Sequence, residues 1–150
     1  MPNHNGEEQK LLQTALKVMD NAYVLWGFKV GAAVLAEDNK IYEGCNVESW
    51  ISGLGLCAER NAINHAVLHG NKKIKMVAVV IEDKNVETTR PCGVCLQYIK
   101  DFSENNVRVI MAKAKARKIL SESFDVKTIE ELLPYSYEMR QRALDSFLQS

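Results

Sequence analysis

The apolar residues near the amino terminus recur at helical spacing, and those that follow recur at the spacing of strands. A helix is predicted over residues 7–20, because apolar side chains three and four positions apart share one of its faces. Two strands are predicted over residues 29–36 and 41–47, with the polar residues 37–40 forming a hairpin turn between them. The apolar positions of the helix are Leu11, Leu12, Ala15, Leu16 and Met19.

The rest of the chain alternates between helical and extended patterns. Residues 57–69 and 93–103 predict two helices, and Gly70 is expected to end the first of them, since glycine tolerates the left-handed conformation. Residues 76–81 and 107–112 are nearly continuous apolar runs, as expected for strands buried on both faces. Beyond them the pattern predicts a short edge strand around Ile119, a helix at 128–133 and, after Pro134, an extra helix at about 138–148.

The order of these elements predicts an α/β fold, a three-layer α/β/α sandwich around one mixed sheet of about five strands. No repeat, low-complexity tract or linker divides the chain, so residues 1–150 are expected to form a single domain. Right-handed crossovers between strands would bring the starts of the helices at 57–69 and 93–103 close together. Both of these starts carry cysteines.

The balance of charge narrows the class of partner. The chain has 19 lysines and arginines and 19 aspartates and glutamates, so its formal net charge is zero. A nucleic-acid partner is therefore not expected, because phosphate backbones select an excess of basic residues, and a small uncharged ligand fits better. No stretch approaches the roughly 20 apolar residues of a membrane span, and residues 1–10 lack the apolar run of a secretory signal.

A cytoplasmic location is therefore the default expectation, and it changes the interpretation of the four cysteines. In a reducing compartment they are expected to serve a metal or catalysis rather than disulfides. Cys92 and Cys95 stand three apart on the first turn of a predicted helix, where both sulfurs share one side and the helix terminus stabilises thiolates. Cys57 supplies a third sulfur at another helix start, whereas Cys45 is interpreted as a core residue of a strand.

Three cysteines suit a catalytic Zn²⁺, because three protein ligands leave a fourth position open to water. The metal lowers the pKa of that water to roughly 7. Glu59, close to Cys57 in sequence, can lie beside the water and carry its proton, acting first as a base and then as an acid. A cysteine, any residue and a glutamate, followed later by Pro-Cys-x-x-Cys, match the signature of the zinc deaminases.

From about residue 21 to residue 134, the chain resembles the small, homotetrameric, three-cysteine zinc class of cytidine deaminases. The resemblance implies hydrolytic deamination of cytidine or deoxycytidine by zinc-activated water, in a cytoplasmic enzyme of pyrimidine salvage that assembles as a homotetramer. It implies a nucleoside substrate and neither a nucleic acid nor a membrane as a partner. The motifs that carry the resemblance are Phe28-Lys29-Val30-Gly31-Ala32-Ala33, Asn46-Val47-Glu48, Cys57-Ala58-Glu59-Arg60 and Pro91-Cys92-Gly93-Val94-Cys95.

The same resemblance implies roles for residues around the metal. The ring of Phe28 would lie against the pyrimidine, and Asn46 and Glu48 would bind a sugar hydroxyl. The backbone near Ala58 would contact the edge of the base. Arg60 would donate to the thiolates and offset the surplus negative charge that three of them leave on a dication.

Three features depart from the family's pattern. Leu96 stands where the family often has an arginine. Leu25-Trp26-Gly27 replaces the usual tyrosine-serine approach to the first strand, so a different pocket mouth is expected. The family commonly ends with an aromatic residue that caps a neighbouring subunit's site, and Tyr137 is the candidate for that cap here. Blasticidin-type deaminases resemble this ending more closely, but they lack the glutamate at the position of Glu48. Glu48 therefore favours an unmodified ribose or deoxyribose.

Two other functions stay open at this point. One is deamination of a modified nucleoside or a nucleoside antibiotic such as blasticidin. The other is a structural-zinc interaction module without turnover, which needs a fourth ligand such as Cys45 and gives Glu59 no role. His65 and His69, four apart, could be a metal pair but are interpreted as surface or interface residues, about 12 Å along the helix from Cys57 to the nearer of them.

Overall fold

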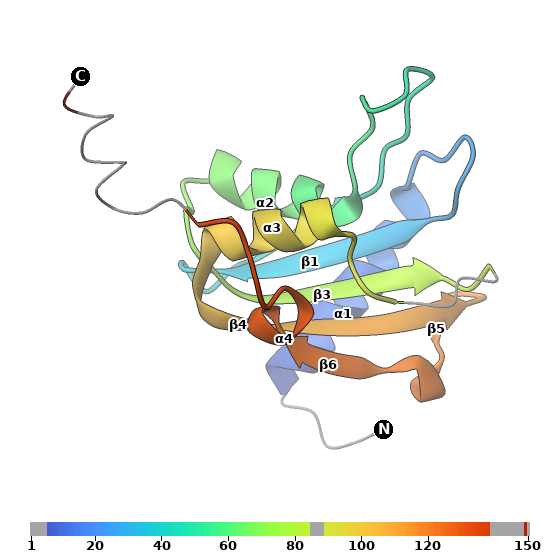
Figure 1. Ribbon diagram of the computed structural model, residues 1–150. Helices are drawn as coiled ribbons and strands as arrows, with labels where there is room; N and C mark the ends of the chain where they lie inside the picture. Colours follow the sequence, from blue (N-terminus) through green and yellow to red (C-terminus); the bar gives the residue numbers. More distant parts are fainter. Residues whose placement is uncertain (1–5, 85–88, 139–148, 150) are drawn as a thin grey trace.

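The computed structural model describes residues 6–84, 89–138 and 149, which form a six-stranded sheet with helices on both of its faces (Figure 1). Single turns of 3₁₀ helix follow the first helix at Met19–Asn21 and precede the last strand at Ser121–Ser123. The helices are α1 (Gly6–Val18), α2 (Ala58–Leu68), α3 (Gly93–Phe102) and α4 (Ile129–Leu132). The strands are β1 (Val30–Ala36), β2 (Ile41–Cys45), β3 (Ile74–Glu82), β4 (Ser103–Lys115), β5 (Lys118–Ile119) and β6 (Asp125–Thr128).

The topology of the sheet determines where α2 and α3 begin. The strand order is β2-β1-β3-β4-β5, and β6 also pairs with β4. β1 is antiparallel to both β2 and β3, so β2 and β3 run in the same direction. β3 and β4 are parallel, with α3 as the crossover between them. Because α2 follows β2 and α3 follows β3, both helices begin at the same end of the sheet.

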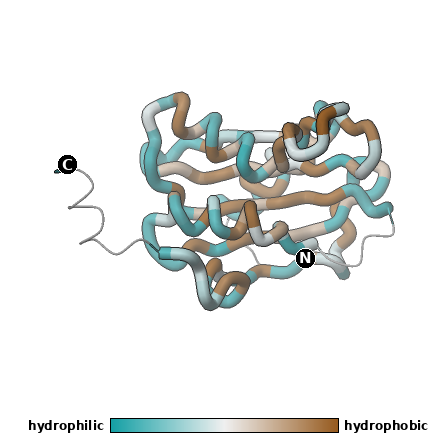
Figure 2. The backbone as a smooth tube through the Cα atoms, turned by 45° about the horizontal axis from the view of Figure 1, so that its top comes forward, coloured by the Kyte–Doolittle hydropathy of each residue, from teal (hydrophilic) through white to brown (hydrophobic). Residues whose placement is uncertain are grey.

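The core consists of two layers of apolar side chains, one on each face of the sheet. Val77 and Val79 of β3 point towards α2 and α3, whereas Ala78 and Val80 point towards α1. Since both faces are covered, β3 is apolar at nearly every position, and the central strands are mostly brown in Figure 2. The three-layer α/β/α sandwich around a mixed sheet that the sequence predicted is confirmed.

α2 packs on β2 at Gly44, where the two backbones touch. A methyl group at Gly44 would lie 2.3 Å from the amide nitrogen of Ala62 and 2.7 Å from the carbonyl oxygen of Ala58. Only glycine leaves this space free. The contact fixes the first turn of α2 against the sheet, and with it the positions of Cys57 and Glu59.

The predicted elements agree with the observed ones within a few residues, and Gly70 has the left-handed conformation, with φ at 90°. β6 was not predicted, because residues 125–128 contain a single apolar side chain and become a strand only by pairing with β4. The predicted helix at 138–148 lies almost entirely outside the described residues. Within the described part of the chain, no helix has both the length and the apolarity that crossing a membrane demands. The single-domain organisation and the cytoplasmic location stay predictions.

Candidate active site

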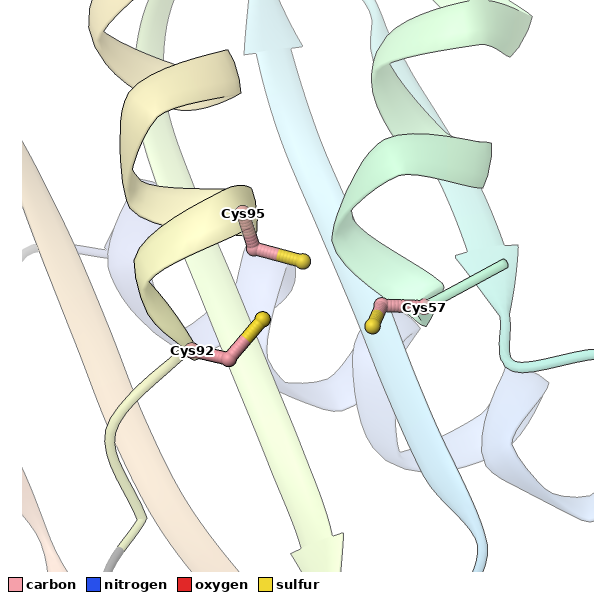
Figure 3. A group of neighbouring side chains, drawn as sticks. All are labelled: Cys57, Cys92 and Cys95. Atoms are coloured by element: carbon pink, nitrogen blue, oxygen red, sulfur yellow. The ribbon is translucent and has the colours of Figure 1, made fainter. Parts of the chain in front are cut away.

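Three cysteine sulfurs meet between the starts of α2 and α3 (Figure 3). Cys57 is the N-cap residue of α2, Cys92 is the N-cap residue of α3, and Cys95 lies in the first turn of α3. The two N-cap residues have extended backbones, and neither side chain caps its own helix. All three sulfurs lie within 4.8 Å of one another. The grouping that the sequence predicted from two separate helix starts is therefore present in the fold.

This sulfur cluster suits a zinc ion in both geometry and chemistry. Zinc–sulfur bonds of about 2.3 Å in a tetrahedral site place the sulfurs about 3.8 Å apart. The three sulfurs here lie within 4.8 Å of one another, so a small rotation of the side chains would bring them to that distance. Among the described residues, no histidine, aspartate, glutamate or further cysteine joins the group. Cys45, the fourth cysteine, stands outside it. A set of three ligands is the catalytic rather than the structural pattern.

Arg60 provides positive charge beside the sulfurs. Its Nη2 atom donates a hydrogen bond of 3.6 Å to the Sγ atom of Cys57. The pKa of the Cys57 thiol lies well below its ordinary value, because the thiol of Cys95 and the guanidinium of Arg60 both donate towards its sulfur. The Nε atom of Arg60 is buried without a hydrogen-bond partner among the described residues. Buried donors normally have an acceptor, and the thiolates of a metal site beside Arg60 would provide one.

Glu59 is a buried carboxyl group at the same helix start. The residue is 5% exposed, although glutamate is almost never buried without a charged partner. Burial raises the pKa of its carboxyl to about 7, and the nearby Cys57 thiolate adds to the rise. A carboxyl group whose pKa is raised towards neutrality can both accept and release a proton near neutral pH.

A cavity of about 240 Å³ opens onto Glu59, Cys57 and Cys92. Its volume lies below the roughly 300–1,000 Å³ of pockets for drug-sized ligands, so it suits a small ligand. A second, wider hollow of about 550 Å³ continues from it, and the two share Asn46, Glu48 and Cys57. The residues predicted from sequence that line the smaller cavity are Phe28, Asn46, Glu48, Cys57, Ala58, Glu59 and Cys92.

Asn46 and Glu48 hold the backbone of the segment that carries Phe28. The Asn46 side chain accepts a hydrogen bond from the amide of Val30 (2.8 Å) and donates one to the carbonyl oxygen of Phe28 (2.9 Å). Glu48 accepts hydrogen bonds from the amides of Trp26 (2.7 Å), Gly27 (3.1 Å) and Leu25. These bonds hold the pKa of the Glu48 carboxyl below its usual range. The sequence left open whether Asn46 and Glu48 satisfy a turn or bind a sugar, and their contact with a sugar stays a prediction.

Two tryptophans lie at the mouth of the pocket, one where the sequence predicted an altered mouth and one that no motif indicated. Trp26 and Trp50 line the wider hollow, and their rings meet edge to face with centroids 5.0 Å apart. They come from two loops that lie side by side at one end of the sheet (Figure 1). Both side chains are well exposed. The departure at residues 25–27 predicted a different pocket mouth, whereas no spacing rule links Trp26 to Trp50.

Tyr137 does not line either hollow within one chain. Its backbone nitrogen donates to the side-chain oxygen of Gln97, and its carbonyl oxygen accepts from the Gln97 amide, both at 2.9 Å. These two hydrogen bonds hold the segment that follows α4 against α3. The Tyr137 side chain is exposed. A cap over a neighbouring subunit's pocket involves a second chain and stays a prediction. Leu96, where the family often has an arginine, is packed in the core.

The fold and the motif together define a deaminase-type hydrolase. The family model of the cytidine and deoxycytidylate deaminase zinc-binding region matches residues 5–112, and the chain belongs to this family. A cytidine deaminase from Sporosarcina psychrophila is 35% identical over 130 residues, which cover 86% of this chain and 90% of that protein.

Two further comparisons bear on fold and substrate. The crystal structure of a cytidine deaminase from Burkholderia pseudomallei matches with a TM-score of 0.74 and 30% identity, over 86% of this chain and 98% of that one. A blasticidin-S deaminase from Bacillus cereus is 27% identical over 141 residues, which cover 90% of this chain and 95% of that protein. The α/β fold is thus shared with cytidine deaminases, and an antibiotic deaminase is among the relatives.

Proposed function

We propose that the protein is a zinc-dependent cytidine deaminase that converts cytidine or deoxycytidine and water into uridine or deoxyuridine and ammonia. The observation that carries the proposal is that Glu59 opens onto the same small cavity as Cys57 and Cys92, two of the three clustered cysteines. Hydrolysis of the C4–N bond of cytosine needs a Lewis acid and a proton carrier at one place. The absence of a fourth donor among the described residues weighs against an interaction module held by structural zinc.

Cys57, Cys92 and Cys95 would hold the zinc ion, which when bound would supply a polarised water at neutral pH. In the proposed reaction Glu59 takes a proton from this water as the C4–O bond forms. It would pass this proton to the ring nitrogen N3, and would then move the second proton from the new C4 hydroxyl to the amino group, so that C4=O forms, the C4–N bond breaks and ammonia leaves. Arg60 offsets the surplus negative charge of the sulfurs, which keeps them from repelling an electron-rich transition state.

The base would lie in the small cavity between Phe28 and the start of α2. The Phe28 ring offers an apolar face for the pyrimidine, and the backbone near Ala58 offers polar groups to its edge. The sugar would then extend towards Asn46 and Glu48, where the two hollows join. The wider hollow provides room beyond the sugar and supports a second candidate function, deamination of a larger nucleoside such as blasticidin S.

An ultraviolet assay tests the proposed function and separates these two candidates. Zinc-loaded protein should reduce the absorbance of cytidine and deoxycytidine as the base becomes uracil, with kcat/KM higher than for blasticidin S. A higher kcat/KM for blasticidin S would assign the antibiotic as the better substrate. Protein with zinc bound and no absorbance change on any cytosine compound would contradict both candidates.

Glu48→Gln should raise the KM for cytidine by about tenfold, the effect of losing one hydrogen bond to a charged group. The new amide would set an N–H donor against the backbone donors at residues 25–27, so the segment that carries Phe28 would lose its anchor. Steady-state kinetics of Glu48→Gln and of Glu104→Gln, an exposed carboxylate on β4, measure the effect. Equal KM values for both variants and the parent protein would contradict a role of Glu48 in binding cytidine.

We also propose a homotetramer, as the family resemblance implies. Apolar side chains are exposed on the loop that follows β2 and on the loop before β1, beside the wider hollow, and burial between subunits would stabilise them. Light scattering of the purified protein measures the assembly, and a monomer would contradict it. The exposed apolar side chains of this region are Trp26, Trp50, Ile51 and Leu54.

A further inference from the structure

His65 and His69 form a compact pair at the carboxyl end of α2, away from the sulfur cluster. Their imidazole ring centroids are 4.9 Å apart. His69 is exposed, and His65 is half-buried. Four residues of helix place two side chains on the same face, which is the spacing that helical metal sites use.

The hydrogen bonds of both rings leave the same nitrogen available. Nδ1 of His65 lies 3.0 Å from the carbonyl oxygen of Glu43, and Nδ1 of His69 lies 2.9 Å from the carbonyl oxygen of His65. A carbonyl oxygen only accepts hydrogen bonds, so each Nδ1 must be the protonated donor. In a neutral imidazole the other nitrogen, Nε2, then carries a lone pair. Metal-binding histidines are oriented by this kind of bond to a backbone carbonyl.

The separation of the rings fits two bonds to one ion. With metal–nitrogen bonds of about 2.1 Å, two imidazole centroids lie about 4.6 Å apart at a right angle and about 5.3 Å apart at a tetrahedral angle. The observed 4.9 Å falls between these values. The negative end of the α2 dipole is also at this place, and it favours a cation.

Tyr42 supports both imidazole rings. Its ring packs against both imidazoles, with centroids 5.3 Å from His65 and 5.2 Å from His69. Tyr42 itself is buried, and its hydroxyl donates a 2.6 Å hydrogen bond to Asp38. Because the rings are held before an ion binds, little ordering entropy is lost on binding.

We propose that His65 and His69 bind a divalent transition-metal ion through their Nε2 atoms, as a second metal site independent of the three cysteines. Imidazole pairs of this kind select ions such as Ni²⁺, Cu²⁺ and Zn²⁺ rather than Ca²⁺ or Mg²⁺, which prefer oxygen ligands. The bound ion would join two turns at the end of α2 and, through the bond from His65 to Glu43, fasten that end to the edge strand β2.

Calorimetric titration of the zinc-loaded protein with Ni²⁺ tests this site, since nickel, unlike copper, does not oxidise thiols readily. The matched variants are His65→Asn and His69→Asn, because the asparagine amide can still donate to the same carbonyl oxygen while Nε2 is lost. The control is His4→Asn, which alters the third histidine of the chain. Nickel that enters the sulfur cluster would do so equally in all four proteins, so the difference between them reports the histidine pair.

The wild-type protein and His4→Asn should each bind one Ni²⁺ per chain at this site. His65→Asn and His69→Asn should each bind it about a hundredfold more weakly or worse, since the loss of one ligand removes the gain from simultaneous attachment. Both variants should keep their zinc and their circular dichroism spectrum. Nickel affinity that is equal in the wild type and His69→Asn, or that falls in His4→Asn, would overturn the proposal. His69 is exposed, so this variant remains informative if His65→Asn fails to fold.

Discussion

Glu59→Gln is expected to abolish nearly all deaminase turnover while the protein keeps one zinc ion per chain. Glutamine has the shape of glutamate, so the sulfur cluster beside it should stay intact, but an amide can neither accept nor deliver the proton. Loss of a positioned general acid–base group lowers kcat by about 10²–10⁴-fold. Because Glu59 would act in more than one proton transfer, we expect the upper part of that range. Absorbance measurements with cytidine give the turnover, and metal analysis of the same sample gives the zinc content.

The neutral side chain should also stabilise the protein slightly or leave it unchanged. Glu59 is buried and its carboxyl is costly to ionise there. A variant that is inactive, zinc-loaded and at least as stable as the parent would separate a chemical role from a structural one. Glu43→Gln, which alters an exposed carboxylate on β2, is the matched control and should keep full activity. Turnover of Glu59→Gln within tenfold of the parent protein would contradict the proposed mechanism.

Cys92→Ser should lose both the zinc ion and the activity, and it should lower the midpoint of thermal unfolding. A serine hydroxyl is not deprotonated at neutral pH and is a poor zinc ligand, so two sulfurs remain where three are needed. The metal would join the starts of α2 and α3, and its binding stabilises the folded state by about 4 kcal/mol when free zinc is a thousand times its dissociation constant. Cys92 is exposed, so the substitution by itself disturbs little packing.

Cys45→Ser is the matched control for this experiment. Cys45 is the cysteine outside the sulfur cluster, and burial raises the pKa of its thiol. This variant should keep one zinc per chain and its turnover. A chelator added to the parent protein should reproduce the loss seen in Cys92→Ser, and zinc should restore the parent but not the variant. Full zinc content in Cys92→Ser, or zinc loss in Cys45→Ser, would contradict the assigned ligand set.

Most of the secondary structure and the sulfur cluster were predictable from the sequence for a physical reason. Apolar periodicity is a local property, so α1, the β1–β2 hairpin and the buried runs of β3 and β4 are visible without coordinates. The cluster of Cys57, Cys92 and Cys95 followed because crossovers have one hand, which places successive helix starts at one end of a sheet. Glu59 was found because it lies two residues after Cys57 in the deaminase signature.

The tertiary structure decided the features that depend on partners far apart in sequence. β6 is a strand because β4 offers it an edge, and the anchoring of residues 25–30 by Asn46 and Glu48 depends on backbone amides that no local pattern marks. The meeting of Trp26 and Trp50, and the bond from His65 to Glu43, likewise arise from loops and strands brought together by folding. The amino-acid pattern was enough to predict most of the elements and the meeting of the three cysteines. Only the packed chain determined the shape of the pocket around them, because hydrogen bonds and ring contacts between distant segments exist only after the core has formed.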